Sequence, residues 1–271
     1  MIREASRLDN PSLEVRIIIE KSCNLPIEAQ IMNPFCTITD DMAKKAKSML
    51  EMRLESIPMA YITGEKEFYG HIFKVTKDVL IPRPDTEIIV EKTIEIAKQK
   101  ARSSDVRILD LCTGSGAIGS SVAYETGIQV CLSDISKEAL EIAKYNYKAI
   151  TGKEADARVG SLLEPWDKDR FDIIATNPPY LTDAWYEETD EDVKKEPSLA
   201  LLGFGDDGLN IIREIINSAP NYLKNGGVLL IEADYRQIEI CARLLSSKGF
   251  RDIEIAKDLN NKDRVVYGRR E

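Results

Sequence analysis

The sequence predicts an α/β fold in which a mostly parallel, Rossmann-like sheet carries helices on both faces. From about residue 105 onward, short apolar runs alternate with segments whose apolar residues recur at helical spacing. This alternation is typical of strands joined by crossover helices. In addition, the glycine-rich stretch 114–119 lies between the first apolar run and the first helical segment, as it does in nucleotide-binding folds.

The strands and helices of this α/β part can be placed in order along the chain. Strands are expected at 106–111, 128–133, 157–159, 171–176 and 228–232, with two more near 251–255 and 264–268. Helices are expected at 116–125, 136–150 and 208–223, the last of these ending near Asn225-Gly226-Gly227, and a further helix carries Ile238, Cys241, Ala242 and Leu245 on one face. Gly249 is expected to end that helix.

Residues 1–75 differ from the rest and are predicted to form a small helical domain, which leaves 76–271 as the larger domain. One helix opens at Pro11, with Leu13, Ile17 and Ile18 on one side. A second helix follows the sequence Thr-Asp-Asp at 39–41, a typical N-terminal cap. The two helices together indicate a separate core in this part of the chain.

Residues 58–87 are expected to connect the two domains. The alternating apolar residues and the glycines of 64–75 predict a β-hairpin. Two prolines then hold Arg83 in a rigid extended segment, which acts either as a linker or as part of the wall of a site. Asp85 or Thr86 is expected to cap the following helix.

The composition argues against several classes of function. The 271 residues contain 31% charged and 43% hydrophobic residues, and no apolar run approaches the roughly 20 residues that a membrane helix needs. No apolar signal-peptide core follows Met1, so a cytoplasmic protein is expected. The net charge of −9 argues against broad nucleic-acid binding.

Cysteine and histidine usage points away from disulfides and metal sites. The five cysteines are scattered and form no C-x-x-C pair, so reduced thiols are expected. His71 is the only histidine and is expected on the surface or in a loop. A histidine-based zinc site or a Ser-His-Asp triad is therefore not expected, and no metal is predicted.

The loop after the first expected strand is the first candidate site. Gly114 and Gly116 let the backbone turn tightly and approach a ligand, and the following helix offers its N-terminal amides. The candidate cofactor-binding residues are Cys112, Thr113, Gly114, Ser115 and Gly116. The strand–loop–helix context makes nucleotide-like binding the favoured interpretation of the G-x-G-x-x-G match.

Asp134 ends the second expected strand, about 20 residues after the glycine loop, where a carboxylate can accept hydrogen bonds from both hydroxyls of a ribose. The alternative is that Asp134 stabilises the N-terminus of helix 136–150; ribose binding is favoured because of the glycine loop. Leu162 follows the third expected strand and offers an apolar surface for an adenine base.

The second candidate site is the stretch Asn177-Pro178-Pro179-Tyr180, which follows the strand expected at 171–176. Two prolines cannot continue a strand, so the chain leaves the sheet as a stiff loop. This loop presents an amide side chain, backbone carbonyls and an aromatic ring at a strand end, where ligands of open α/β sheets bind. Its acceptors suit a planar NH2 group.

The fold alone leaves two interpretations, a nicotinamide-dependent dehydrogenase or an S-adenosylmethionine-dependent methyltransferase. Three features favour the methyltransferase. Asp110 precedes the glycine loop, the loop at 177–180 lies across from it, and no proton donor for hydride chemistry stands out.

Several motifs resemble the HemK/PrmC family of methyltransferases, which modify the glutamine side chain in the Gly-Gly-Gln motif of peptide chain release factors. The resemblance covers nearly the whole chain. It rests on Phe68-Tyr69-Gly70, Leu80 to Glu87, the glycine loop, Asn177-Pro178-Pro179-Tyr180, Glu196 to Leu201, and Asp263-Arg264-Val265-Val266. Enzymes that methylate base amino groups of DNA or RNA share Asn-Pro-Pro-Tyr, so this activity is the alternative; Ile-Pro-Arg-Pro-Asp-Thr-Glu favours the glutamine enzymes.

The resemblance implies a fold, a cofactor and a partner. It implies a seven-stranded class I methyltransferase domain with an antiparallel last strand, S-adenosylmethionine as cofactor, and a helical N-terminal domain that helps hold a release factor. It also implies that Asn177 and the Pro178 carbonyl grip the substrate amide, next to Pro179, while Tyr180 packs on the glutamine. Asn177 is further expected to border the cofactor.

Two positions depart from the family pattern. Cys112 stands where many methyltransferases have the first glycine of the loop. The segment 201–209 is one residue longer than the usual Gly-Gly-x-Asp-Gly-Leu spacing, and this leaves the role of that loop open.

Overall fold

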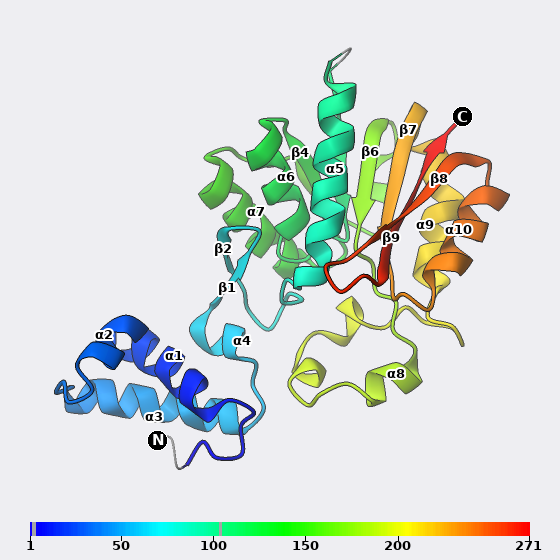
Figure 1. Cartoon of the computed structure of the whole chain (residues 1–271). Coiled ribbons are helices and arrows are strands. Elements are labelled where there is room, and N and C mark those ends of the chain that lie inside the picture. The colour runs from blue at the N-terminus through cyan, green and yellow to red at the C-terminus, as the bar shows by residue number, and fades with distance from the viewer. Residues whose placement is uncertain (2–3, 103–104) are drawn as a thin grey trace. The chain divides into compact units, whose positions relative to one another are not determined.

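The computed structural model of the chain describes residues 1, 4–102 and 105–271. They form two compact units (Figure 1). The smaller unit comprises Met1–Glu65 and Asp190–Lys195, and the larger comprises Lys66–Thr189 and Glu196–Glu271. Phe68 and Phe73 of the hairpin are buried in the core of the larger unit, which is why the units part after residue 65.

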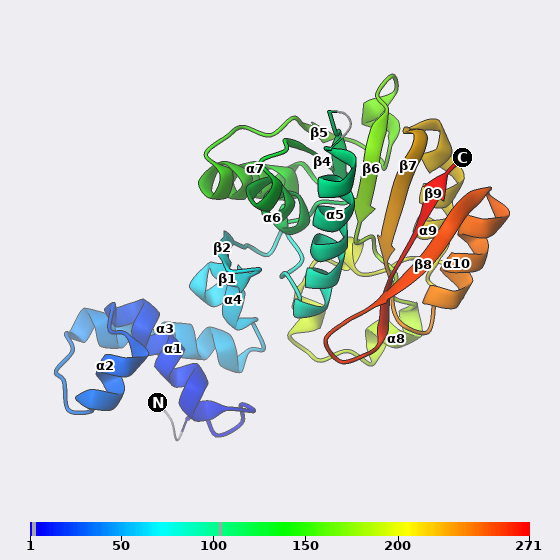
Figure 2. The same ribbon diagram turned by 45° about the horizontal axis from the view of Figure 1, so that its top comes forward.

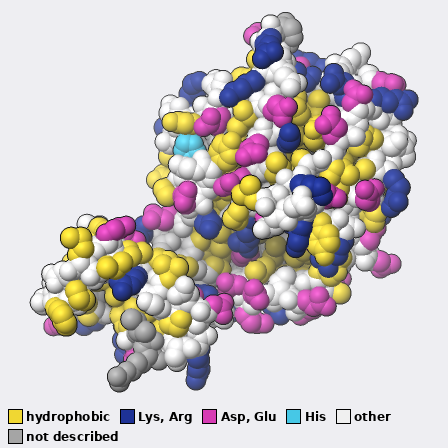
Figure 3. Space-filling model, in the orientation of Figure 1, with side chains coloured by type: hydrophobic (Ala, Val, Ile, Leu, Met, Phe, Trp, Pro, Cys, Tyr) yellow, Lys and Arg dark blue, Asp and Glu magenta, His cyan; other side chains and the backbone are white. Residues whose placement is uncertain are grey.

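The smaller unit is helical. Its helices are α1 (Pro11–Cys23), α2 (Ile27–Met32), α3 (Asp40–Leu54) and α4 (Met59–Thr63). The helices predicted at Pro11 and after Thr39 are confirmed, and the Thr39 side chain accepts a hydrogen bond from the Met42 amide. The predicted face of α1 is confirmed for Ile18, which is buried together with Val15, and is wrong for Leu13, which is 46% exposed. Figure 3 shows hydrophobic side chains gathered on this unit's surface.

The larger unit holds the predicted sheet, with strand order β5-β4-β3-β6-β7-β9-β8. The strands are β3 (Ile108–Leu111), β4 (Val130–Asp134), β5 (Ala157–Val159), β6 (Phe171–Thr176), β7 (Leu223–Glu232), β8 (Phe250–Lys257) and β9 (Asp263–Arg270). Neighbouring strands from β5 to β7 pair in parallel, whereas β9 is antiparallel to both β7 and β8. This is the seven-stranded class I methyltransferase topology. The hairpin is confirmed as β1 (Glu65–Phe68) and β2 (His71–Lys74).

Helices cover both faces of the sheet, as Figures 1 and 2 show. One face packs on α5 (Glu87–Lys100), α6 (Ala117–Thr126) and α7 (Lys137–Thr151), and the other on α9 (Asn210–Ser218) and α10 (Ile238–Ser247). Successive strand residues alternate between the two cores: Ile108 faces the first and Leu109 the second, and Ile173 and Ile174 do the same. Alternation with apolar residues on both sides explains why the strands are continuous apolar runs.

The helix predicted at 208–223 is wrong in its second half. The α-helix α9 ends at Ser218, a 3₁₀ turn spans Ala219–Asn221, and β7 begins at Leu223. Pro220 explains the early end, because it has no N–H for the helical hydrogen bond. Gly226 and Gly227 lie inside β7 rather than at a helix end.

Two smaller features complete the larger unit. His71, expected on the surface or in a loop, is the first residue of β2, and its ring packs edge-on against Tyr124 with 4.4 Å between centroids; its side chain is visible in Figure 3. The sequence signals missed the short helix α8 (Asp183–Glu187). Within the described part of the chain, no helix has the length and apolar character that crossing a membrane requires.

Candidate active site

The register of the sheet brings three predicted site residues to one level. Leu111 of β3 pairs with Ser133 of β4 on one side and with Thr176 of β6 on the other. The residues that follow these partners are Cys112, Asp134 and Asn177. They therefore lie together at the carboxyl edge of the sheet, where the strand order reverses between β3 and β6 and where open α/β sheets bind ligands.

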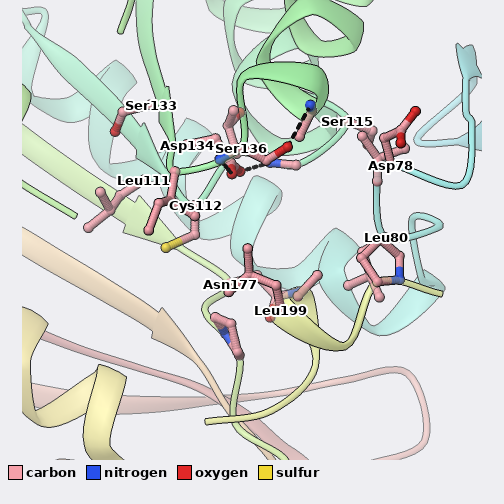
Figure 4. Close-up of a pocket in the computed structure, with 18 of the residues that line it drawn as sticks. Asp78, Leu80, Leu111, Cys112, Ser115, Ser133, Asp134, Ser136, Asn177 and Leu199 are labelled. Carbon is pink, nitrogen blue, oxygen red and sulfur yellow. Dashed lines mark hydrogen bonds between the residues drawn. The ribbon is translucent and has the colours of Figure 1, made fainter. Parts of the chain in front are cut away.

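A cavity of about 380 Å³ opens at this edge, within the range typical of small-molecule sites. Figure 4 shows Ser115, Asp134 and Ser136 on one side of it and Asn177 and Leu199 on the other. Among the predicted site residues, the cavity is lined by Cys112, Thr113, Gly114, Ser115, Asp134, Leu162, Asn177 and Pro179. Gly116, Pro178 and Tyr180 are not part of its lining.

Asp110 holds the glycine loop from beneath. Its carboxylate is fully buried and accepts hydrogen bonds from the Thr113 hydroxyl and, at 2.8 Å, from the Gly119 amide. Burial raises the pKa of Asp110 to about 7. Asp110 thus links the two ends of the loop without reaching the cavity, which gives a structural reason for an aspartate at this place in the sequence.

Cys112 occupies the position where many related loops have glycine. Its φ is +58°, a left-handed conformation that costs a residue with a side chain about 1–2 kcal/mol. Burial raises the pKa of the Cys112 thiol, so the sulfur is a neutral part of the cavity wall. The loop therefore keeps the left-handed conformation at this position, although Cys112 has a side chain where glycine has none.

Gly116 serves packing rather than the cavity. A Cβ built on Gly116 would lie 3.0 Å from Cα of Ala143 in α7, and its φ is +80°. Asn146, one turn further along α7, donates hydrogen bonds to the carbonyl oxygens of Ser115 (2.8 Å) and Lys74 (2.9 Å). These contacts tie the glycine loop to α7 and to the hairpin, and no sequence signal pointed to Asn146.

Asp134 is held by the chain on both of its oxygens. Oδ2 accepts from the Gly114 amide at 2.8 Å and Oδ1 from the Ser136 amide at 2.9 Å. Burial raises the pKa of Asp134. The cap of α7 is supplied by Ser136, whose hydroxyl accepts from the Ala139 amide at 3.0 Å. Each carboxylate oxygen can accept more than one hydrogen bond, so Asp134 keeps acceptor capacity toward the cavity.

Thr86 occupies the N-cap position of α5, but the predicted side-chain capping is wrong, and both residues have other partners. Neither Asp85 nor Thr86 makes a side-chain cap to α5. Asp85 pairs with Arg264 at 2.9 Å, and the Thr86 hydroxyl donates to Glu232 at 3.1 Å while accepting from the Asn177 amide at 3.2 Å. The sequence pattern could not show these partners, because each lies far away in the chain.

The segment 201–209 braces the Asn-Pro-Pro-Tyr loop. The Leu201 carbonyl accepts from the amides of Tyr180 (3.1 Å) and Leu181 (2.8 Å). The Gln237 side chain, at the start of α10, donates to the carbonyl oxygens of Tyr180 (2.8 Å) and Asp207 (2.7 Å). The role that the sequence left open for this segment is therefore structural support of the loop.

Tyr180 lies outside the cavity lining, whereas Arg83 is part of it. The Tyr180 ring packs against the core between the sheet and α9, and burial raises the pKa of its hydroxyl. Arg83 lines the cavity and pairs with buried Glu196, whose other oxygen accepts from the Ile81 amide at 2.9 Å. Of the two roles left open for Arg83, the structure thus places it in the wall of the cavity.

The family to which the chain belongs follows from comparison with known proteins. A family model described as "PrmC N-terminal domain" matches residues 2–64, and one described as "Methyltransferase small domain" matches residues 92–195. A curated "Release factor glutamine methyltransferase" of Borreliella burgdorferi is 37% identical over all of this chain and 94% of that protein. The chain belongs to the release factor glutamine methyltransferase family.

A further relative agrees with this assignment, and two solved structures share the fold. A protein of the same name from Clostridium acetobutylicum is 38% identical over 87% of this chain and 83% of that protein. A methyltransferase from Pyrococcus furiosus has a TM-score of 0.53 at 16% identity, covering 84% of this chain and 98% of that chain. A 16S rRNA methyltransferase of T. thermophilus, solved with AdoMet and guanosine, has a TM-score of 0.54 at 19% identity, covering 76% of this chain and 50% of that one. At these identities the structures show the fold alone.

Proposed function

We propose that this chain methylates the side-chain amide nitrogen of the glutamine in the Gly-Gly-Gln motif of peptide chain release factors, with S-adenosylmethionine as the methyl donor. The observation that supports this most directly is that Asn177, Cys112 and Asp134 lie side by side at the carboxyl edge of the sheet and line one cavity. A cofactor-binding loop and an amide-binding loop then face the same space.

The residues present suit S-adenosylmethionine. Asp134 has acceptor capacity for ribose hydroxyls, and the loop from Cys112 to Ser115 offers backbone at the cavity wall. Leu162 supplies an apolar surface for a base. When bound, the cofactor would supply the methyl group for the glutamine nitrogen, and the N–H proton that this nitrogen loses would pass to water.

The task of the chain's own residues is to hold a poor nucleophile. The lone pair of an amide nitrogen is delocalised into its carbonyl group, so the nitrogen must be aimed accurately. Asn177 Oδ1 lies at the cavity wall and is suited to accept a hydrogen bond from one N–H group of the substrate amide. The carbonyl of Pro178, the next residue, is assigned the second N–H group, although Pro178 itself does not line the cavity. Both hydrogen bonds would strengthen as positive charge develops on nitrogen. The two prolines and the bracing segment 201–209 keep both acceptors rigid. Correct aim also supplies the advantage of proximity.

The test is mass spectrometry of a purified release factor after incubation with the chain and S-adenosylmethionine. A gain of one methyl group on the glutamine of Gly-Gly-Gln is expected, and none on a control factor that carries asparagine there. Parallel incubation with DNA and RNA tests the base-methylating alternative. Methyl transfer to nucleic acid without transfer to the factor would overturn the proposal.

Asn177→Ala removes the side-chain acceptor and should lower kcat by about 10²–10³-fold, as loss of one preorganised hydrogen bond in a transition state does. Binding of S-adenosylmethionine, measured by calorimetry, should be partly retained. Near-normal turnover of the variant would contradict the assignment of Asn177.

A further inference from the structure

Glu232, the last residue of β7, lies beside Asn177 without lining the cavity. Thr176 of β6 pairs in parallel with Ile231 of β7, so Asn177 and Glu232, the next residues, are at the same level of the sheet. The Glu232 side chain is buried. Its Oε1 accepts a hydrogen bond from Thr86, and its Oε2 has no hydrogen-bond partner among the described residues.

Thr86 connects this carboxylate to the Asn177 amide. A threonine hydroxyl has a single proton, and in Thr86 that proton goes to Glu232 at 3.1 Å. The Thr86 oxygen can then only accept from Asn177, whose Nδ2 lies 3.2 Å away. The amide NH2 of Asn177 must therefore point to Thr86, and its oxygen is left for another donor.

The orientation of this amide matters because its two ends have nearly the same shape. Steric packing cannot distinguish a carbonyl oxygen from an NH2 group, so hydrogen-bond partners must do so. In the reverse orientation Asn177 would present a donor to the substrate NH2 group, which is itself a donor. The Glu232 carboxylate rules out the reverse orientation, because it accepts the Thr86 proton and leaves the Thr86 oxygen able only to accept from Asn177.

We propose that Glu232 and Thr86 are positioning residues that fix the direction of the Asn177 amide, so that its oxygen faces the substrate nitrogen. This inference rests on the proposed function. Glu232 acts through Thr86 and through its direct attraction for the Asn177 amide, and we assign it neither contact with substrate nor acceptance of the proton that the reaction releases. The direction of the three hydrogen-bonding groups is set by the fact that a carboxylate can only accept.

The charge state of Glu232 is set by its neighbours from several elements. Burial raises the pKa of Glu232 to about 7. The side chains of Thr86 and Asn177 and the positive charge of Arg264 on β9 oppose this rise, and the negative charge of Asp85 adds to it. A protonated Glu232 can donate to Thr86, whose own proton can then turn to Asn177 Oδ1. The productive direction is therefore enforced when Glu232 is ionised, and kcat should rise as the pH increases through about 7.

The experiment compares three variants with the wild-type chain, using release factor and S-adenosylmethionine. Thr86→Val keeps the shape but removes the hydroxyl, and kcat is expected to fall at least tenfold while the Kd for S-adenosylmethionine stays within about threefold. Thr86→Ser restores the hydroxyl and should recover most of kcat. Glu232→Gln can both donate and accept, so kcat should fall and the rise of kcat between pH 6 and 8 should disappear.

The outcomes separate this inference from the proposed function. A wild-type chain that does not methylate release factor overturns the proposed function, and the inference with it. An active wild-type chain with Thr86→Val and Glu232→Gln at wild-type kcat overturns the inference alone. Equal loss in Thr86→Val and Thr86→Ser also overturns it, because a purely structural role does not depend on the hydroxyl. If Thr86→Val does not fold, the pH profile of Glu232→Gln decides.

Discussion

Asp134 combines an internal structural role with acceptor capacity for a ligand. Asp134→Ala should weaken binding of S-adenosylmethionine by about 10- to 100-fold, which corresponds to one or two lost charge-assisted hydrogen bonds. Isothermal titration calorimetry measures this directly. Asp134→Asn keeps one acceptor oxygen, so its affinity for S-adenosylmethionine should lie between that of the wild-type chain and that of Asp134→Ala. Unchanged affinity in Asp134→Ala would contradict the ribose assignment.

At the scale of single residues, sequence reasoning finds those whose local context is distinctive. Asp134 is the last residue of an apolar strand and Asn177 directly follows another, so their places at the sheet edge could be predicted. Thr86, by contrast, was expected to act as a helix cap. Its partners are 91 and 146 residues away in the chain, and a local pattern carries no information about contacts at such separations.

Among the structural elements, the segment 201–209 and the Asn-Pro-Pro-Tyr loop support each other through close backbone contact. A Cβ on Gly203 would lie 1.9 Å from the Gly208 carbonyl oxygen and 2.7 Å from Cα of Tyr180. Gly203→Ala should therefore push the two segments apart, lowering kcat at least tenfold and the free energy of unfolding by about 1–3 kcal/mol.

The matched control for this change is Gly268→Ala on β9, where the added Cβ would come no nearer than 3.2 Å to neighbouring side chains. It should affect stability without a comparable loss of kcat. Enzyme kinetics with release factor, together with urea unfolding, measure both effects. A Gly203→Ala variant as active as Gly268→Ala would show that the bracing contact has no catalytic consequence.

Periodicity predicted the type and order of the sheet strands but not every boundary. The strand at 171–176 matches the expected limits, because hydrophobic residues fill it and prolines end it. The helix expected at 208–223 ends early, because Pro220 cannot donate a helical hydrogen bond even though the apolar residues continue at helical spacing. Short elements such as α8 have too few residues to show a period.

For the molecule as a whole, buried carboxyl groups make stability depend on pH. Burial raises the pKa of Asp110 from its usual acidic range to about 7, so the folded chain binds a proton there that the unfolded chain has already lost. The stabilising contribution is complete below about pH 4 and is lost as the pH rises through about 7. Glu232 acts in the same direction.

Asp110→Asn removes one of these groups. Between pH 4 and 7 its free energy of unfolding should fall less steeply than that of the wild-type chain, by up to a few kcal/mol, since one pKa unit corresponds to about 1.4 kcal/mol. Urea denaturation at several pH values tests this. Parallel stability profiles for the two proteins would show that Asp110 does not titrate in this range.

The Gln237 side chain joins Tyr180 and Asp207 by two hydrogen bonds, although it does not line the cavity. Anyone redesigning this enzyme for another amide substrate would choose positions for randomisation by their distance from the ligand, and such a library would omit Gln237. It would also omit compensating substitutions at position 237. A redesigned loop of different length needs new hydrogen bonds to its main-chain carbonyl groups, and the side chain at this position can supply them. Libraries that co-vary position 237 with the loop should therefore contain more functional members than libraries restricted to the cavity wall.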